Sequence, residues 1–152
     1  MLFRSKADWS FIRSVKDAVK IPVIANGDIT SLADAAEAKR LSGADGVMVG
    51  RGAYGRPWFI RQVMEFLKTG QQVSDPSIAV QLETVLTHFE DMLLHYGAET
   101  GVRMARKHVA WYSKGLPGSA EFRAEVNQHA DAERVRTLIR RFYEPLLEPR
   151  AA

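Results

Sequence analysis

Apolar residues in the first half of the chain form two short runs that are separated by helical patterns. Residues 21–25 (IPVIA) and 46–50 (GVMVG) are rich in β-branched residues and are bounded by Gly, Asn and Asp, which predicts two strands. Helical spacing of apolar residues predicts helices around them, at residues 7–19, 32–41 and 57–69. Strands that are apolar throughout, with helices between them, indicate parallel pairing with both faces of the sheet covered.

Short polar and glycine signals mark the ends of these helices. Ser31 followed by Asp34 has the spacing of an N-terminal capping box. Gly43 is placed to end its helix in the left-handed conformation. Pro57 suits a first helical turn, and Gly70 lies just past the end of the same helix.

Only helical patterns follow the loop-forming segment TGQQVSDP at residues 69–76. Three or four helices are expected there, within residues 77–97, 101–115, 119–128 and 131–146, and they form a small helical bundle. The chain is therefore expected to have two domains, residues 1–72 and 73–152.

Two parallel strands are too few to form a stable sheet by themselves. The first domain corresponds to roughly a quarter of an eight-stranded (β/α)8 barrel, which takes about 250 residues. The expected fold class is α/β plus all-α: the last two βα units of such a barrel, incomplete in this chain, followed by the helical bundle.

Composition and charge narrow the function classes. The sequence contains no Cys, which excludes disulfides, Cys-based zinc sites and a cysteine nucleophile. Its longest apolar runs fall far short of the roughly 18 residues that span a bilayer, and the N-terminus is too charged for a signal peptide, so we expect a cytoplasmic protein with no membrane partner. Residues 1–74 hold 11 Lys and Arg against 7 Asp and Glu, whereas residues 75–152 hold 10 against 11. A basic surface in the second half is therefore a local patch.

The two strands end in segments that suit an anion. Asn26-Gly27-Asp28 and Gly50-Arg51-Gly52 follow consecutive parallel strands, so they should be neighbours at the edge where ligands bind in α/β folds. Glycines allow backbone N–H groups to approach an anion, and Arg51 adds a charge-assisted contact. The alternative is that these glycines only make tight turns. Asp28 is expected to hold its loop rather than act as a general base.

A second candidate surface lies on the helix expected at residues 101–115. Arg103, Arg106, Lys107 and Lys114 fall within an arc of about 100°. Residues 101–114 contain four cations and no Asp or Glu, with Trp111 at the border of the arc. Such a face suits RNA phosphates and base stacking; the alternative is a solvated helix face.

The histidines give no metal or triad pattern. None of the four has metal-ligand spacing with a carboxylate partner, and His108 and His129 stand isolated in the sequence. We therefore expect no metal site, and no Ser/His/Asp arrangement supports a catalytic residue in this chain.

Three segments resemble a known family. They are IPVIANGDI (21–29), GADGVMVGRGAYGRPWFI (43–60) and RMARKHVAWY (103–112). In this order they closely resemble the C-terminal half of bacterial tRNA-dihydrouridine synthases, of the B-type, nitrogen-regulation-protein-3-like branch. The resemblance runs from about Ala7 to Tyr143.

The resemblance implies a flavoenzyme. Such enzymes have an FMN-binding (β/α)8 barrel followed by a helical tRNA-binding domain, and they reduce the 5,6 double bond of uridines in tRNA, with NADPH as the reductant of FMN. By this analogy the FMN phosphate is held by the backbone of Asn26, Gly27, Asp28, Gly50 and Arg51.

The same resemblance implies that the helical domain binds tRNA. Arg103, Arg106 and Lys107 would hold tRNA phosphates, and Trp111 and Tyr112 would shape that surface.

The family's catalytic cysteine and most of its flavin pocket precede the segments that match, and this chain has no Cys. We therefore expect a fragment that is inactive by itself and retains no flavin after purification. Its exposed strand edges predict self-association.

Other functions account for fewer of the features seen in the sequence. A stand-alone RNA-binding helical module is the main alternative, supported by the basic helix and opposed by the incomplete barrel. A DNA-binding regulator is disfavoured because no helix-turn-helix pair with base-reading side chains is evident. Another phosphate-binding barrel enzyme would share NGD and GRG but would not need RMARKHVAWY.

Overall fold

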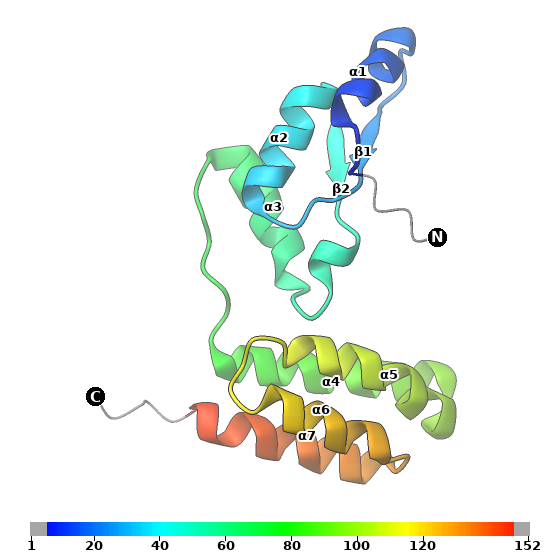
Figure 1. The fold of residues 1–152 in the computed structure, drawn as a ribbon, viewed down its shortest axis with the longest axis vertical. Coiled ribbons are helices and arrows are strands. Elements are labelled where there is room, and N and C mark those ends of the chain that lie inside the picture. The colour runs from blue at the N-terminus through cyan, green and yellow to red at the C-terminus, as the bar shows by residue number, and fades with distance from the viewer. Residues whose placement is uncertain (1–5, 148–152) are drawn as a thin grey trace, which may run out of the picture. The chain divides into compact units, whose positions relative to one another are not determined.

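The computed structural model describes residues 6–147, which divide into two compact units (Figure 1). The division falls between Asp75 and Pro76, in the segment that connects α3 (Trp58–Thr69) to α4 (Ile78–Tyr96). The boundary that the sequence placed after residue 72 lies in the same connecting segment.

The first unit alternates helices and strands. Its elements are α1 (Trp9–Ala18), β1 (Ile24–Asn26), α2 (Leu32–Ser42), β2 (Gly46–Met48), a 3-10 turn η1 (Arg51–Ala53) and α3. The strands pair in parallel, with Ile24 opposite Gly46 and Asn26 opposite Met48. The predicted order of elements and the parallel pairing are confirmed, although each strand is shorter than the apolar run that predicted it.

The helix ends follow the local sequence signals. Ser31 and Asp34 form a complete capping box, in which each side chain accepts a hydrogen bond from the other residue's backbone N–H. Gly43 and Gly70 end α2 and α3 with φ of 61° and 74°, the left-handed region that glycine adopts without steric cost.

Helices cover one face of the strand pair. Ala25 points to the covered face and is fully buried, and α2 packs against both strands. The core beside it consists of Ile29, Ala35, Ala38, Phe59 and Val63. Ile24 and Met48 point to the other face and are 51% and 54% exposed. The prediction that both faces are covered is therefore wrong for the described residues, because alternate strand residues face opposite sides and helices shield only one of them.

The first helix also exposes apolar residues. Phe11 is 65% exposed and Val15 is 43% exposed, and no residue of α1 is buried although α1 packs against α2. Apolar surface of this extent is typical of a contact face.

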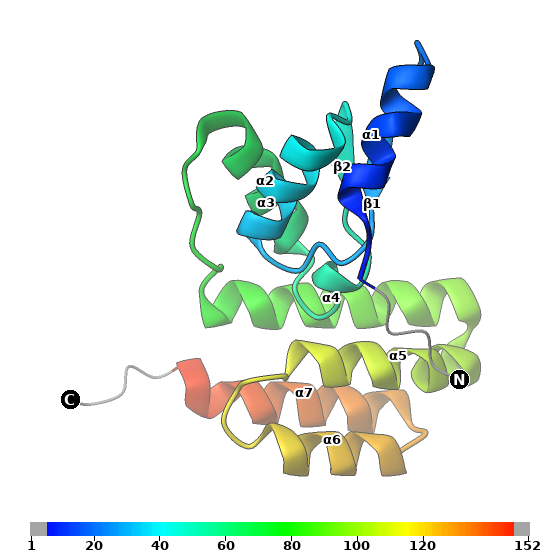
Figure 2. The same ribbon diagram turned by 45° about the horizontal axis from the view of Figure 1, so that its top comes forward.

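The described part of the second unit is a bundle of four helices, where the sequence predicted three or four. It consists of α4, α5 (Ala98–Tyr112), α6 (Ser119–Gln128) and α7 (Ala132–Leu147), which Figure 2 shows side by side. Both α4 and α6 pack against α5 and α7. The largest fully buried side chains in this unit are Tyr143, Phe89 and Ile139.

A glycine allows α4 and α5 to approach closely. A Cβ on Gly101 would lie 2.8 Å from both Leu93 Cα and Met92 O. Residue 101 must therefore be glycine for the two helices to keep this separation.

Candidate functional site

The loop after β1 is held by contacts to the first residue of α1 and to the segment just before it. Trp9 Nε1 donates to Gly27 O (2.9 Å), and Ala7 N donates to Asp28 Oδ2 (2.7 Å). Gly27 has φ of 113°, and a Cβ there would lie 2.7 Å from Ala7 Cβ. Asp28 has φ of 53°, a left-handed conformation that Asp tolerates better than most residues. The Asp28 carboxylate therefore acts as a fixed acceptor within the loop.

The two glycines of the loop after β2 serve different purposes. A Cβ on Gly52 would lie 2.2 Å from Ile29 O, so glycine is required for this loop to pack against the loop after β1. A Cβ on Gly50 would meet no described atom within 4 Å. Packing in this unit does not demand glycine at position 50, and the space beside its backbone is open to a ligand.

The two loops and the ends of both strands line a half-open cavity of about 580 Å³. Its lining includes all five residues predicted to hold a phosphate, Asn26, Gly27, Asp28, Gly50 and Arg51, together with Ile29, Thr30, Met48, Gly52 and Tyr54. Parallel pairing explains this meeting, because it brings the carboxyl ends of β1 and β2 to one edge.

Arg51 supplies positive charge to this cavity. Its Nη2 lies 3.3 Å from Asp28 Oδ1, and its side chain is 79% exposed. An ion pair this exposed is weak, so the guanidinium remains able to bind an incoming anion.

Arg56 joins the two loops, and it was not among the site residues predicted from the sequence. Its Nε donates to Gly52 O (2.7 Å) and its Nη2 donates to Thr30 O (2.5 Å). Its guanidinium carbon also lies 4.2 Å from the centre of the Phe59 ring. The position of Arg56 in GRP, between the second loop and α3, was the only sequence signal for this role.

The predicted RNA-binding cations of α5 differ in their surroundings. Arg103 and Lys107 are exposed, as is Lys114 just after the helix. Arg106 is partly buried, and its Nη2 and Nε donate to His129 O at 2.6 Å and 3.2 Å. Arg106 therefore fixes α5 to the segment between α6 and α7, a contact that the sequence could not reveal.

The two aromatic residues at the end of α5 also differ in how far they are buried. Trp111 is partly buried, and its ring lies 4.9 Å from that of His108 in an edge-on arrangement. Tyr112 is only 6% exposed, and its hydroxyl lies 3.1 Å from His88 Nδ1. Burial raises the pKa of Tyr112 to about 12. Tyr112 is thus a core residue that supports the surface without forming it.

His108, which stands isolated in the sequence, has an aromatic neighbour on another helix. Its ring centre lies 5.2 Å from that of His88 on α4, a neighbour that only helix packing provides. Burial lowers the pKa of His108, and the nearby charges of His88 and Lys107 lower it further. Among the described residues, no group of three or more His, Asp or Glu is placed to hold a metal ion.

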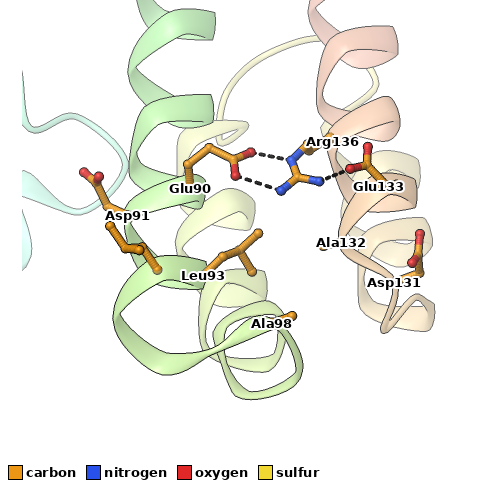
Figure 3. A pocket seen from close by; sticks show the side chains of 9 residues that line it. Glu90, Asp91, Leu93, Ala98, Asp131, Ala132, Glu133 and Arg136 are labelled. Carbon is orange, nitrogen blue, oxygen red and sulfur yellow. Dashed lines mark hydrogen bonds and ion pairs between the residues drawn. The ribbon is translucent and has the colours of Figure 1, made fainter.

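A second hollow, of about 560 Å³, lies in the helical unit between α4 and α7 (Figure 3). The Arg136 guanidinium is bonded to both Glu90 and Glu133, and Asp91 and Asp131 also line the hollow. Four carboxylates against one guanidinium give this surface the same sign as RNA phosphates. We therefore place no RNA contact there.

Comparison with known proteins decides the family. The family model for dihydrouridine synthases matches residues 2–146. The chain belongs to the dihydrouridine synthase family. The recognition made from the three sequence segments is thereby confirmed.

The curated relatives of this chain support its assignment to the dihydrouridine synthase family. A probable tRNA-dihydrouridine synthase of Rickettsia conorii is 58% identical over 96% of this chain. A tRNA-dihydrouridine synthase B of Xanthomonas axonopodis pv. citri is 43% identical over 95% of the chain, and that of Pseudomonas aeruginosa is 39% identical over 93%. The chain spans only 43–44% of the length of these three relatives. None of its described helices is long and apolar enough to cross a membrane.

Proposed function

We propose that this chain forms part of a flavin-dependent tRNA-dihydrouridine synthase and that the cavity between the loops after β1 and β2 holds the FMN phosphate. The observation that supports this proposal is that Gly50, Arg51 and the Asn26–Asp28 loop all line one cavity. This cavity lies at the carboxyl edge of two parallel strands. In this proposal the strands and their helices are the last two βα units of a (β/α)8 barrel.

The residues present fit a phosphate group. Arg51 offers an exposed guanidinium, and the open space beside Gly50 allows a phosphate oxygen to approach the backbone. The Asp28 carboxylate also lines the cavity; its Oδ2 accepts from Ala7 N and its Oδ1 pairs with Arg51 Nη2, so its negative charge is partly offset. When bound, FMN would supply the hydride that reduces uridine, with NADPH as its reductant.

The helical unit is proposed to bind the tRNA substrate. Arg103 and Lys107 are exposed on one helix and are free to meet phosphates, whereas Arg106 would act mainly by fixing that helix. Trp111 lies beside this surface and Tyr112 supports it from the core. An enzyme that acts on tRNA implies a cytoplasmic location, and no DNA partner is proposed.

A chimeric enzyme tests the proposal. The segment of the Rickettsia conorii relative that matches this chain would be replaced by residues 2–147, and the purified chimera would be assayed for bound FMN and for dihydrouridine in tRNA. We expect both, because 58% identity preserves the packing surfaces. A folded chimera without flavin would contradict the flavin proposal.

The chain by itself is proposed to be inactive. It contains no Cys to protonate the reduced uracil ring, and its described residues form only two strands. Purified chain should be colourless and should form no dihydrouridine. Stoichiometric FMN, or product formed by this chain alone, would contradict this.

An RNA-binding module remains the second candidate function. The helical unit is compact from Pro76 onwards and carries exposed cations on α5. Tight tRNA binding by the chain, combined with a folded chimera that lacks flavin, would favour this alternative.

A further inference from the structure

The loop after β1 and the loop after β2 contact each other directly, and Arg56 spans their junction. Gly52 in the second loop lies against Ile29 O in the first, so closely that a Cβ would be 2.2 Å from that oxygen. The Arg56 guanidinium then donates to Gly52 O on one side and Thr30 O on the other. Two carbonyls from different loops are thereby held by one rigid planar group.

The position of the Arg56 side chain is itself fixed. It begins in the segment just before α3, and its guanidinium stacks on Phe59, which is 2% exposed in the core. The loops are thus tied through Arg56 to the buried part of the unit. Arg51 shows the opposite behaviour, because its side chain is 79% exposed and its Nη2 lies 3.3 Å from the Asp28 carboxylate.

We propose that Arg56 is a positioning residue that sets the spacing of the two loops and thereby the affinity of the cavity for a phosphate group. It does not line the cavity, whereas Thr30 and Gly52, whose carbonyls it holds, both do. This inference rests on the proposed phosphate site. Its physical basis is that an anion site built from backbone groups binds well only when those groups are held in place beforehand.

The test uses the chain as it is, labelled with 15N and titrated with inorganic phosphate. Amide shifts of Gly50, Arg51 and Gly52 report binding, and hydrogen exchange of residues 26–31 and 50–54 reports the order of the two loops. The variants are Arg56→Gln, Arg56→Lys and, as a matched control, Arg61→Gln. Arg61 is an exposed arginine of α3 that lies outside the cavity lining.

We expect both Arg56 variants to bind phosphate roughly tenfold more weakly and to exchange faster in both loops, because two hydrogen bonds from a charged donor are lost or reduced to one. Arg56→Lys keeps the charge but cannot fork between two carbonyls. Arg61→Gln should match the wild type in both measurements.

Three results would overturn the inference. Unchanged phosphate affinity in Arg56→Gln would show that the bridge does not serve anion binding. Wild-type affinity in Arg56→Lys, with loss in Arg56→Gln, would show that the charge acts directly. No phosphate-dependent shift in the wild type would remove the phosphate site itself, and faster exchange in Arg56→Gln would then mark a purely structural bridge.

Discussion

Arg51 Nη2 lies 3.3 Å from Asp28 Oδ1, so a residue that follows the second strand meets one that follows the first. Twenty-three positions separate them in the sequence, and the parallel pairing of β1 and β2 brings them together. The pair is exposed, which makes it a weak contributor to stability but leaves its guanidinium accessible to an anion.

Replacing Arg51 should therefore weaken phosphate binding while changing the stability of the fold little. Arg51→Ala is expected to change the free energy of unfolding by no more than about 1 kcal/mol, as for other exposed ion pairs. The same variant should abolish phosphate-induced amide shifts at Gly50 and Gly52. Urea unfolding and an NMR titration give the two measurements. A variant that retains wild-type phosphate affinity would remove Arg51 from the site.

The close approach of α4 and α5 predicts a cost at Gly101. Gly101→Ala would place a methyl group 2.8 Å from Leu93 Cα and Met92 O, which are backbone atoms that cannot move independently. After allowing for the better helix propensity of Ala, we expect a net loss of about 1–2 kcal/mol in the free energy of unfolding. Thr100→Ala, at an exposed position of the same helix, is the control and should change stability little. Equal effects of the two substitutions would contradict the packing argument.

Exposed cations on α5 predict the RNA surface. The double variant Arg103→Glu, Lys107→Glu should bind tRNA at least tenfold more weakly and should show a shallower dependence of affinity on salt, because fewer counterions are released. The control is Arg61→Glu, Lys68→Glu, which makes the same charge change on exposed residues of α3. Filter binding at several salt concentrations measures both the affinity for tRNA and its dependence on salt. An equal loss in the control would indicate a bulk charge effect.

The ion pair of Glu90 with Arg136 predicts a pH dependence. The hydrogen bond from Arg136 holds the pKa of Glu90 below its ordinary value of 4.5. A carboxyl whose pKa is lowered by folding stabilises the folded state above its unfolded pKa and loses that contribution as the pH falls through the folded pKa.

The free energy of unfolding in urea is compared between the wild type and Glu90→Gln. At pH 7 the wild type should be the more stable, and the difference should shrink as the pH is lowered below 4.5. A difference that stays constant from pH 7 to pH 3 would show that the charge of Glu90 is not involved.

Exposed apolar side chains of the first unit predict self-association. Phe11, Ile24 and Met48 are each more than half exposed, and the two-stranded sheet of the described chain has unpaired edges. Met48→Glu should reduce the associated fraction in light scattering behind size-exclusion chromatography. Leu94→Glu, at an 88% exposed position of the helical unit, should leave that fraction unchanged. A monodisperse wild-type monomer at all concentrations would contradict this prediction.

Much of the first unit could be predicted because its signals are local. The capping box at Ser31 and the left-handed Gly43 and Gly70 depend only on a few neighbouring residues, so they read directly from the sequence. The convergence of Asn26–Asp28 with Gly50–Arg51 was also predictable, because parallel strands always bring their carboxyl ends to one edge.

The sequence by itself thus determined the elements, their order, the family and five of the residues that line the candidate site. Tertiary structure alone decided which charged side chains remain exposed to solvent. Arg51, Arg103 and Lys107 stay exposed, whereas Arg56 and Arg106 donate to carbonyls 26 and 23 positions away. Residue type and helical spacing do not distinguish the exposed side chains from the bonded ones. A guanidinium donates hydrogen bonds to the carbonyls that folding places within its reach, and the sequence does not show which these are.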